Sequence, residues 1–232
     1  MAVARGVLGI KRVGHGGTLD PLATGLLAVL VGETTRATER IHTAPKVYDA
    51  VVRFGSETAT DDREGQATRS AAVPASGSAI EAALAPLRGV IQQVPPAYAA
   101  VKVGGRTAYS RARSGEVFEL AAREVQVHRL EMTDWRPPDA RLLIVCSSGT
   151  YVRSIARDLG RALASAAHLA ALRRLAIGAL DIADAVGIDA LRAAGRDAAI
   201  ARLRVMNDET LVLPRRYFDE SAGKLVGAEG RM

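Results

Sequence analysis

The order of strand-like and helix-like segments is the feature that most restricts the fold of this chain. Apolar or alternating stretches of strand-forming residues lie at 26–32, 46–54, 125–132 and 141–146. Stretches with helical spacing or composition lie at 77–88, 151–164, 168–175 and 190–203. Because the helices do not alternate regularly with the strands, the pattern predicts an α+β fold in which helices flank a mixed, mostly antiparallel sheet.

Two local signals refine this expectation. The stretches at 125–132 and 141–146 are separated by a turn at 135–138, which favours an antiparallel pair. The residues from Ser147 to Thr150 read SSGT and are of the types that cap a helix, so they predict a helix that starts near Tyr151.

Size and composition narrow the class of protein. The 232 residues are enough for one large domain, or for one domain and a remnant of a second. With 31 basic and 25 acidic side chains the net charge is +6, which favours a polyanionic partner. Cys146 is the only cysteine, which excludes an internal disulfide and multi-cysteine zinc or iron–sulfur sites. The longest apolar run, residues 26–31, is far shorter than the roughly 20 residues that cross a bilayer, so no membrane role is expected.

Asp20 lies in a glycine-dense loop, residues 14–25, that reads GHGGTLDPLATG. Pro21 restricts the backbone of Asp20 to extended conformations, so the carboxylate is presented from a fixed backbone, as suits a nucleophile. The local pattern favours another interpretation, in which Asp20 caps a helix with Pro21 at its first position. The glycines of this loop, Gly14, Gly16 and Gly17, fit either a phosphate-binding loop or a sharp turn.

Arg153, Arg157 and Arg161 recur every fourth residue and therefore share one face of the helix predicted at 151–164. For Arg157 and Arg161 the pattern favours a solvated basic stripe. Arg153 lies in the first turn, where a cation opposes the helix dipole, and a buried carboxylate partner would explain its presence there.

A basic segment follows the proline pair at 95–96. It contains Lys102, Arg106, Arg111 and Arg113, interleaved with Tyr98 and Tyr109, and a twelve-residue window over the four cations holds no acid. Basic and aromatic residues in this pattern are typical of a nucleic-acid groove, although an exposed loop without a ligand fits equally well. The four histidines lack metal-ligand spacing, so no zinc site is expected. The adjacent Asp61 and Asp62 predict a turn and not an acid–base pair.

Five ordered segments together resemble one family. They read GHGGTLDPLATGLL, KVYDAVVRFGSETATDDREG, QVPPAYAAVKVGGRTAY, SSGTYVRSIARDLG and LRRLAIG. From about residue 8 to residue 180, the chain strongly resembles the bacterial tRNA pseudouridine(55) synthases. The resemblance implies the pseudouridine synthase catalytic fold and the isomerisation of uridine 55 in the T-arm loop of tRNA, without a metal or other cofactor.

The resemblance also implies site residues, and it outweighs the local preference for Asp20 as a helix cap. The expected catalytic residues are Asp20, Tyr48 and Arg153. Asp20 is expected to be the nucleophile, Tyr48 to stack on the target uracil and take part in proton transfer, and Arg153 to pair with the nucleophilic carboxylate. The expected substrate-binding residues are His15, Tyr98, Lys102 and Arg106.

Two departures from the family pattern shape the domain prediction. The chain lacks the family's N-terminal strand segment with its Lys-Pro pair, so an incomplete sheet edge and lower stability are expected. Residues 1–187 are expected to form the catalytic domain, and residues 188–232 a short remnant of the family's C-terminal RNA-binding domain.

The predicted protein is a cytoplasmic monomer whose partner is the T-arm of tRNA, with no membrane and no small-molecule cofactor. Two alternatives stay open, namely a non-catalytic RNA-binding or tRNA-folding protein and a pseudouridine synthase that acts on another RNA. The joint presence of Asp20, Tyr48 and Arg153 argues against the first alternative, because binding alone needs no nucleophile.

Overall fold

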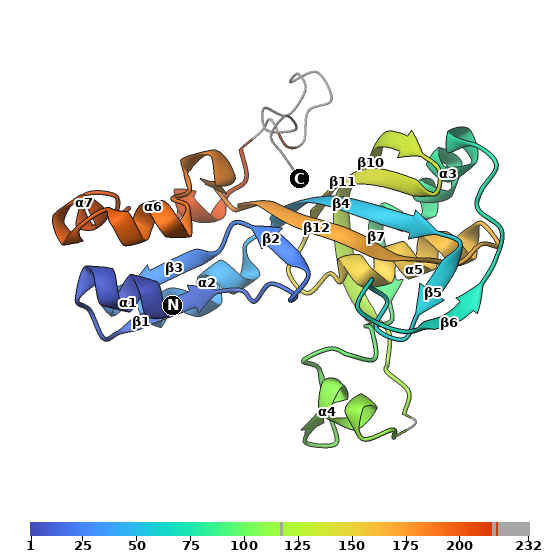
Figure 1. Ribbon diagram of the computed structural model, residues 1–232, viewed down its shortest axis with the longest axis horizontal. Helices are drawn as coiled ribbons and strands as arrows, with labels where there is room; N and C mark the ends of the chain where they lie inside the picture. The colour runs from blue at the N-terminus through green and yellow to red at the C-terminus, as the bar shows by residue number, and fades with distance from the viewer. Residues whose placement is uncertain (117, 215–216, 218–232) are drawn as a thin grey trace. The chain divides into compact units, whose positions relative to one another are not determined.

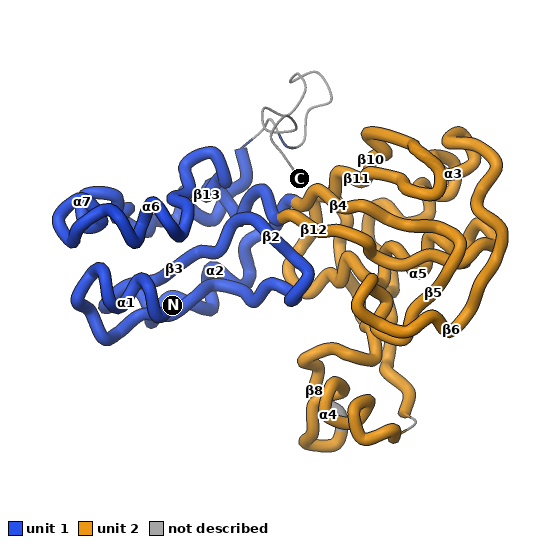
Figure 2. Tube along the Cα trace, in the orientation of Figure 1, with its two compact units in different colours: residues 1–47, 174–232 blue, residues 48–173 orange. Residues whose placement is uncertain are grey.

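The computed structural model describes residues 1–116, 118–214 and 217. The chain forms two compact units (Figure 2). Unit 1 consists of residues 1–47 and the described residues from 174 onward, and unit 2 consists of residues 48–173. Strands β4 (Lys46–Phe54) and β12 (Ala167–Ile177) each contribute residues to both units. The predicted extension at 188–232 lies partly outside the described residues.

The largest sheet has the strand order β13-β12-β4-β11-β10-β7, and β2 also pairs with β12. The strands not yet bounded are β2 (Ala23–Gly25), β7 (Gly89–Gln93), β10 (Arg123–Arg136), β11 (Asp139–Cys146) and β13 (Leu180–Asp181). The pairs β10–β11, β10–β7 and β12–β13 are antiparallel. The α+β prediction, and with it the antiparallel pair at 125–132 and 141–146, is confirmed.

Unit 2 is built around its part of this sheet (Figure 1). Its other elements are β5 (Ser56–Thr58), β6 (Ala67–Ser70), α3 (Gly77–Leu84), η2 (Ala85–Leu87), β8 (Lys102–Val103), β9 (Arg106–Thr107), α4 (Ala108–Arg113) and α5 (Val152–Ala162). Residues 142–146 of β11 are all buried, and α5 buries Ile155 and Leu159. The apolar run of β11 therefore forms the centre of the core, since a strand covered on both faces needs no polar alternation.

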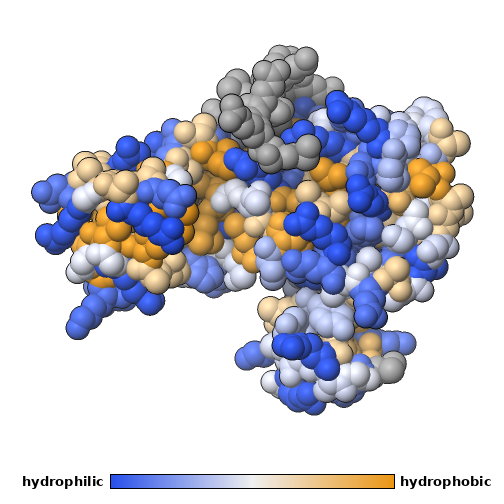
Figure 3. Space-filling view, in the orientation of Figure 1, coloured by the Kyte–Doolittle hydropathy of each residue, from blue (hydrophilic) through white to orange (hydrophobic). Residues whose placement is uncertain are grey.

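Unit 1 contains the N-terminal hairpin and the C-terminal helices. Its elements are α1 (Ala2–Leu8), β1 (Val13–Gly16), β3 (Ala28–Val31), η1 (Gly32–Ala37), α2 (Thr38–Thr43), η3 (Ile182–Asp184), α6 (Ile188–Ala193), α7 (Arg196–Ile200) and η4 (Glu209–Leu211). Strands β1 and β3 pair antiparallel. Leu26, Leu30, Ile41 and Ile177 form its buried apolar cluster. Apolar side chains also gather on the visible face of this unit (Figure 3).

Two local predictions are wrong, whereas the helix predicted to start near Tyr151 is confirmed as α5 but lacks the predicted side-chain cap. Residues 168–175 lie in strand β12 and not in a helix, because this strand is buried between β4 and β13 and tertiary packing outweighs the helix propensity of its Ala, Leu and Arg residues. The stretch 190–203 forms two short helices interrupted at Gly195. Helix α5 has Tyr151 as its N-cap without a side-chain bond, while Ser147 Oγ accepts a hydrogen bond from the Gln126 amide at 3.0 Å.

The basic segment lies apart from the sheet of unit 2 (Figure 1). It consists of the β8–β9 hairpin, which turns at Gly104 and Gly105, followed by α4. Thr107 Oγ1 caps α4 by accepting a hydrogen bond from the Ser110 amide at 3.2 Å. Hydrophilic side chains predominate on its visible face (Figure 3). Within the described part of the chain, no helix is long and apolar enough to span a membrane.

Candidate active site

Asp20 lies in the loop between β1 and β2, in unit 1. The Ala23 amide donates a hydrogen bond to the Asp20 carbonyl at 2.9 Å, and strand β2 starts at Ala23. The interpretation of Asp20 as a helix cap is therefore wrong, because a turn and a strand follow it. Asp20 is half-buried at the start of this turn, and Leu22, two residues further on, is buried.

The glycines before Asp20 serve the close packing of this loop. Gly14 and Gly16 lie in the extended strand β1, so they do not form a phosphate-binding loop. A Cβ at Gly16 would lie 2.1 Å from the Ile41 Cγ2 atom, which leaves no room for any side chain. Gly17 has φ +94°, a conformation that other residues rarely adopt.

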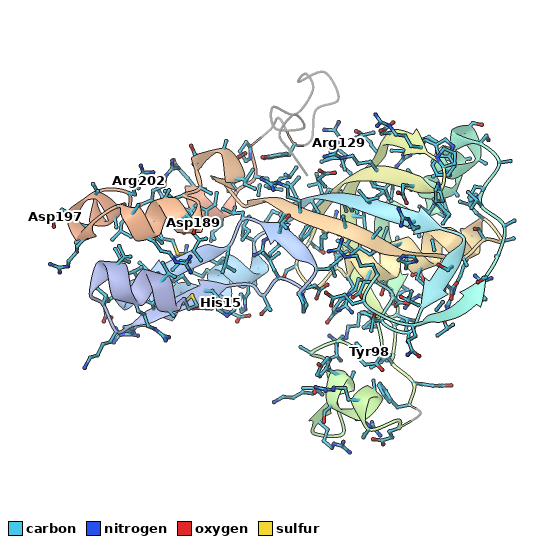
Figure 4. All side chains as sticks on the ribbon, in the orientation of Figure 1. His15, Tyr98, Arg129, Asp189, Asp197 and Arg202 are labelled. Atoms are coloured by element: carbon cyan, nitrogen blue, oxygen red, sulfur yellow. The ribbon has the colours of Figure 1, made fainter. Side chains whose placement is uncertain are left out.

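His15 lies on β1 between these glycines and opposite Val29 of β3 (Figure 4). The ring is half-buried, and its Nδ1 atom is buried without a hydrogen-bond partner among the described residues. Such an atom is typically satisfied by a water or a ligand.

Arg153 is buried in the first turn of α5, with a relative exposure of 6%. Its Nη1 atom donates to the Thr60 carbonyl at 3.0 Å and lies 3.6 Å from Asp62 Oδ2. Its Nη2 atom donates to the Tyr98 carbonyl at 3.2 Å. The expectation that Arg153 needs a buried carboxylate partner is met by Asp62, which the sequence reasoning did not assign to this role.

Asp62 is itself held by the turn that contains it. Its Oδ1 atom accepts hydrogen bonds from Thr60 Oγ1 at 2.6 Å and from the Glu64 amide at 3.0 Å. The turn predicted at Asp61 and Asp62 is confirmed, with Asp61 in a left-handed conformation at φ 59°. Because Oδ1 is occupied within the turn, Oδ2 is directed to Arg153.

The next two arginines of α5 are also paired with acids. Arg157 is 7% exposed and donates to Asp61 at 2.8 Å, to Asp158 at 2.9 Å and to the Val94 carbonyl at 2.8 Å. Arg161 is more exposed and contacts Glu57 through two hydrogen bonds of 3.1 and 2.8 Å. The prediction of a solvated basic stripe is therefore wrong for Arg157, and both arginines fix α5 to the segment at 57–62.

The pKa values of two of these acids are shifted in opposite directions, one by its ion pairs and the other by burial. Hydrogen bonds from Arg161, with a further contribution from Arg69, lower the pKa of Glu57 from 4.5 to about 2. Burial raises the pKa of Asp61, because the cost of desolvating its carboxylate exceeds the stabilisation by Arg157.

Tyr48 and Tyr98 belong to different parts of unit 2. Tyr48 is half-buried on β4. Tyr98 lies where the chain leads into the segment that carries α4 (Figure 4), and its ring packs edge-on against Tyr109 with centroids 6.0 Å apart. Through its carbonyl, Tyr98 also contacts the Arg153 side chain.

The basic segment carries exposed cations, and Glu116 pairs with two of its arginines. Lys102 and Arg106 are both exposed. Arg106 lies 3.4 Å from Glu116, which also pairs with Arg111. The guanidinium of Arg113 lies over the Tyr109 ring, 5.7 Å from its centroid. The segment thus presents cations and an aromatic face together, as the nucleic-acid interpretation requires.

Unit 2 also contains a polar cavity of about 580 Å³. Its lining includes Glu57, Asp61 and Arg161 but neither Tyr48 nor Arg153. The cavity lies beside the Arg–acid pairs of α5, and we do not assign the catalytic residues to it.

Similarity to known proteins agrees with these features. The N-terminal domain of the TruB family pseudouridylate synthases matches residues 5–152, and the C-terminal domain of tRNA pseudouridylate synthase B matches residues 153–210. The tRNA pseudouridine synthase B of Xanthomonas campestris is 46% identical over 86% of this chain and 66% of the relative. The enzyme of the same name from Aromatoleum aromaticum is 42% identical over 100% of this chain and 75% of the relative. This chain thus spans about two thirds of the length of the Xanthomonas relative.

Solved structures extend the similarity to the fold. The structure of a Cbf5-Nop10-Gar1 complex matches 78% of this chain and 45% of the matched chain, with 27% identity and a TM-score of 0.59. That of an archaeal box H/ACA sRNP Nop10-Cbf5 complex matches 94% of this chain and 55% of the matched chain, with 20% identity and a TM-score of 0.62, which shows the shared fold alone. Together with the family matches over residues 5–210, these findings show that the chain belongs to the TruB family of pseudouridylate synthases.

Proposed function

We propose that this protein is a tRNA pseudouridine synthase that isomerises uridine 55 in the T-arm loop, with Asp20 as the nucleophile. The observation that carries the proposal is the buried Arg153, held by Asp62 and two carbonyl oxygens in a chain of the TruB family. A guanidinium fixed in this way keeps one orientation, as pairing with the carboxylate of a nucleophile requires.

The reaction breaks the C1′–N1 bond of uridine, turns the uracil, and joins C5 to C1′. The C5 proton is then lost and N1 gains a proton, so the product is an isomer of the substrate. Attack by the Asp20 carboxylate, on the base or on the sugar, forms a covalent intermediate and divides one difficult rearrangement into easier steps.

Arg153 and Tyr48 have separate roles in this proposal. Arg153 pairs with the Asp20 carboxylate, while Asp62 holds the guanidinium in place. Tyr48 stacks on the extruded uracil, which returns about 1–3 kcal/mol of the cost of unstacking the base. Its hydroxyl then accepts or relays the C5 proton.

The RNA is proposed to contact His15, Tyr98, Lys102 and Arg106. The exposure of Lys102 and Arg106 and the unpartnered Nδ1 of His15 support this assignment. The proposal includes a cytoplasmic monomer without a cofactor, with residues 1–187 as the catalytic domain and residues from 188 onward as part of an RNA-binding domain.

The test is to incubate the protein with unmodified tRNA transcript and to map pseudouridine by carbodiimide adducts and primer extension. A single stop that reports position 55 is the expected result. Binding without any adduct would support the alternative of a non-catalytic tRNA-folding protein. Modification of another RNA, with position 55 of tRNA unmodified, would support the alternative of a pseudouridine synthase that acts on another RNA.

A further inference from the structure

Arg174 of β12 is an almost completely buried cation, with a relative exposure of 1%. Its hydrogen-bond acceptors are carbonyl oxygens, and among the described residues no carboxylate pairs with it. A buried charge is expensive unless its donors are satisfied, and a carboxylate is its usual partner. The arrangement therefore calls for an explanation other than an ion pair.

Arg174 contacts both ends of the loop that carries Asp20. Its Nη2 atom donates to the Gly17 carbonyl at 3.1 Å, three residues before Asp20. Its Nε atom donates to the Leu26 carbonyl at 2.8 Å, six residues after Asp20. The backbone is engaged as well, because the Leu26 amide donates to the Arg174 carbonyl at 2.9 Å. One residue thus closes the ten-residue segment 17–26 with three hydrogen bonds.

The glycines of this segment fit around Arg174. A Cβ at Gly25 would lie 2.3 Å from the Arg174 carbonyl oxygen, so only glycine allows this approach of the two backbones. Gly17 and Gly25 have φ values of +94° and +99°, which other residues rarely adopt. The glycines at 17 and 25 therefore allow Arg174 to approach the loop that contains the Asp20 turn.

We propose that Arg174 is a positioning residue that fixes the Asp20 turn for reaction. This inference rests on the proposed function, in which Asp20 is the nucleophile. Arg174 acts through the loop, at the carbonyls of Gly17 and Leu26. Reactive groups need to be held within a fraction of an ångström, and a displacement of about 1 Å can reduce a rate by about 10²-fold.

The substitution Arg174→Lys separates charge from geometry. An ammonium keeps the positive charge, but it cannot reach in two directions as the planar guanidinium does. The matched control is Arg173→Lys, because Arg173 is the neighbouring residue of β12 and its side chain is exposed on the other face of the strand.

Two measurements on the full chain test the proposal. The first is hydrogen exchange of the Ala23 and Leu26 amides, which donate within the loop and to Arg174, with the β10–β11 amides as the internal reference. The second is the single-turnover rate on tRNA transcript labelled with tritium at uridine C5, since C5 loses its hydrogen when it bonds to C1′. Affinity for the same RNA is measured in parallel, with all variants well below their melting temperatures.

For Arg174→Lys we expect loop exchange roughly 10-fold faster or more with unchanged β10–β11 exchange. We also expect a single-turnover rate reduced by about 10²-fold and an RNA affinity within about twofold of the parent. Arg173→Lys should leave all three quantities within about twofold.

Two results would overturn the proposal. One is an Arg174→Lys rate within a few-fold of the parent, which would mean that the loop needs no such support. The other is uniform faster exchange together with weakened RNA binding, which would make Arg174 a purely structural residue. If the parent protein itself forms no pseudouridine, the proposed function fails, and the exchange measurement alone decides whether Arg174 fixes the loop.

Discussion

Three buried arginines, Arg153, Arg157 and Arg174, have relative exposures of 6%, 7% and 1%. Backbone carbonyls accept hydrogen bonds from each of them, and Arg153 and Arg157 also meet carboxylates. A planar guanidinium satisfied from several directions keeps one orientation, whereas a lysine ammonium in the same place loses contacts. At the scale of residues, the chain therefore uses arginine as a rigid connector.

Arg153→Lys should lower the single-turnover rate of pseudouridine formation by about 10²-fold although the charge is kept. The reason is that an ammonium cannot contact Thr60, Tyr98 and Asp62 and still orient a second carboxylate. The control is Arg161→Lys, which breaks a two-bond contact with Glu57 two turns further along α5. A rate for Arg153→Lys within a few-fold of the parent would show that charge alone suffices.

Tyr48→Phe should bind RNA as the parent does but turn over slowly, by a factor of about 10² or more, because only the hydroxyl can move a proton. Tyr48→Ala should also bind more weakly, because it loses the stacking surface. Filter binding and tritium release on the same preparations separate the two effects. Equal rates for the parent and Tyr48→Phe would remove any role for the hydroxyl.

At the scale of elements, the segment at 57–62 is joined to helix α5 by three pairs of an acid and an arginine. Asp62 faces Arg153, Asp61 faces Arg157, and Glu57 faces Arg161. Of the three arginines, Arg153 and Arg157 are buried, where an isolated cation would be unfavourable. The contacts fix the first turn of the helix and thereby the position of Arg153.

The acid sensitivity of this element follows from Glu57. Its pKa is about 2 in the folded protein against an ordinary 4.5, so its contribution to stability is complete above pH 4.5 and is lost as the pH falls toward 2. Glu57→Gln should therefore cost about 2 kcal/mol at neutral pH and flatten the decline of melting temperature between pH 5 and 3. Asp61, whose pKa is raised, changes the stability with pH in the opposite direction. It is present in both the parent and Glu57→Gln, so it does not contribute to the difference between them. Thermal melts of the two proteins across this range measure the difference, and parallel curves would contradict the assignment.

Sequence patterns predicted the elements whose local and tertiary preferences agree. Strand β4 is predicted with its bounds at Lys46–Phe54 because its apolar residues alternate. The helical interpretation of 168–175 is wrong because β4, a sheet neighbour of β12 that lies far away in the sequence, contributes to its conformation. The pairing of Asp62 with Arg153 spans 91 positions between residues 62 and 153, so spacing alone could not reveal it. Arg157 was misplaced on the surface for the same reason, since its acid lies on a distant turn.

At the scale of the whole molecule, the net charge of +6 favours an RNA partner. Part of this positive charge is exposed on the basic segment, at Lys102 and Arg106. Contacts between such cations and phosphates release counterions, so binding weakens as salt rises.

Lys102→Ala should weaken RNA binding and reduce the slope of log affinity against log salt by about 1, the value for one lost phosphate contact. Arg136→Ala is the control, because Arg136 is exposed at the end of β10 and pairs locally with Asp134. The slopes are obtained from affinities measured at salt concentrations between about 50 and 300 mM. Identical slopes for the parent and Lys102→Ala would place the RNA elsewhere.

The most direct test of the account is the product formed by Asp20→Asn on unmodified tRNA transcript. The amide has nearly the shape of the carboxylate but is not a nucleophile, so we expect no pseudouridine and an RNA affinity within about twofold of the parent. Carbodiimide mapping after prolonged incubation with excess enzyme measures the product, and filter binding measures the affinity. Near-native pseudouridine formation by Asp20→Asn would contradict the assignment of Asp20 as the nucleophile.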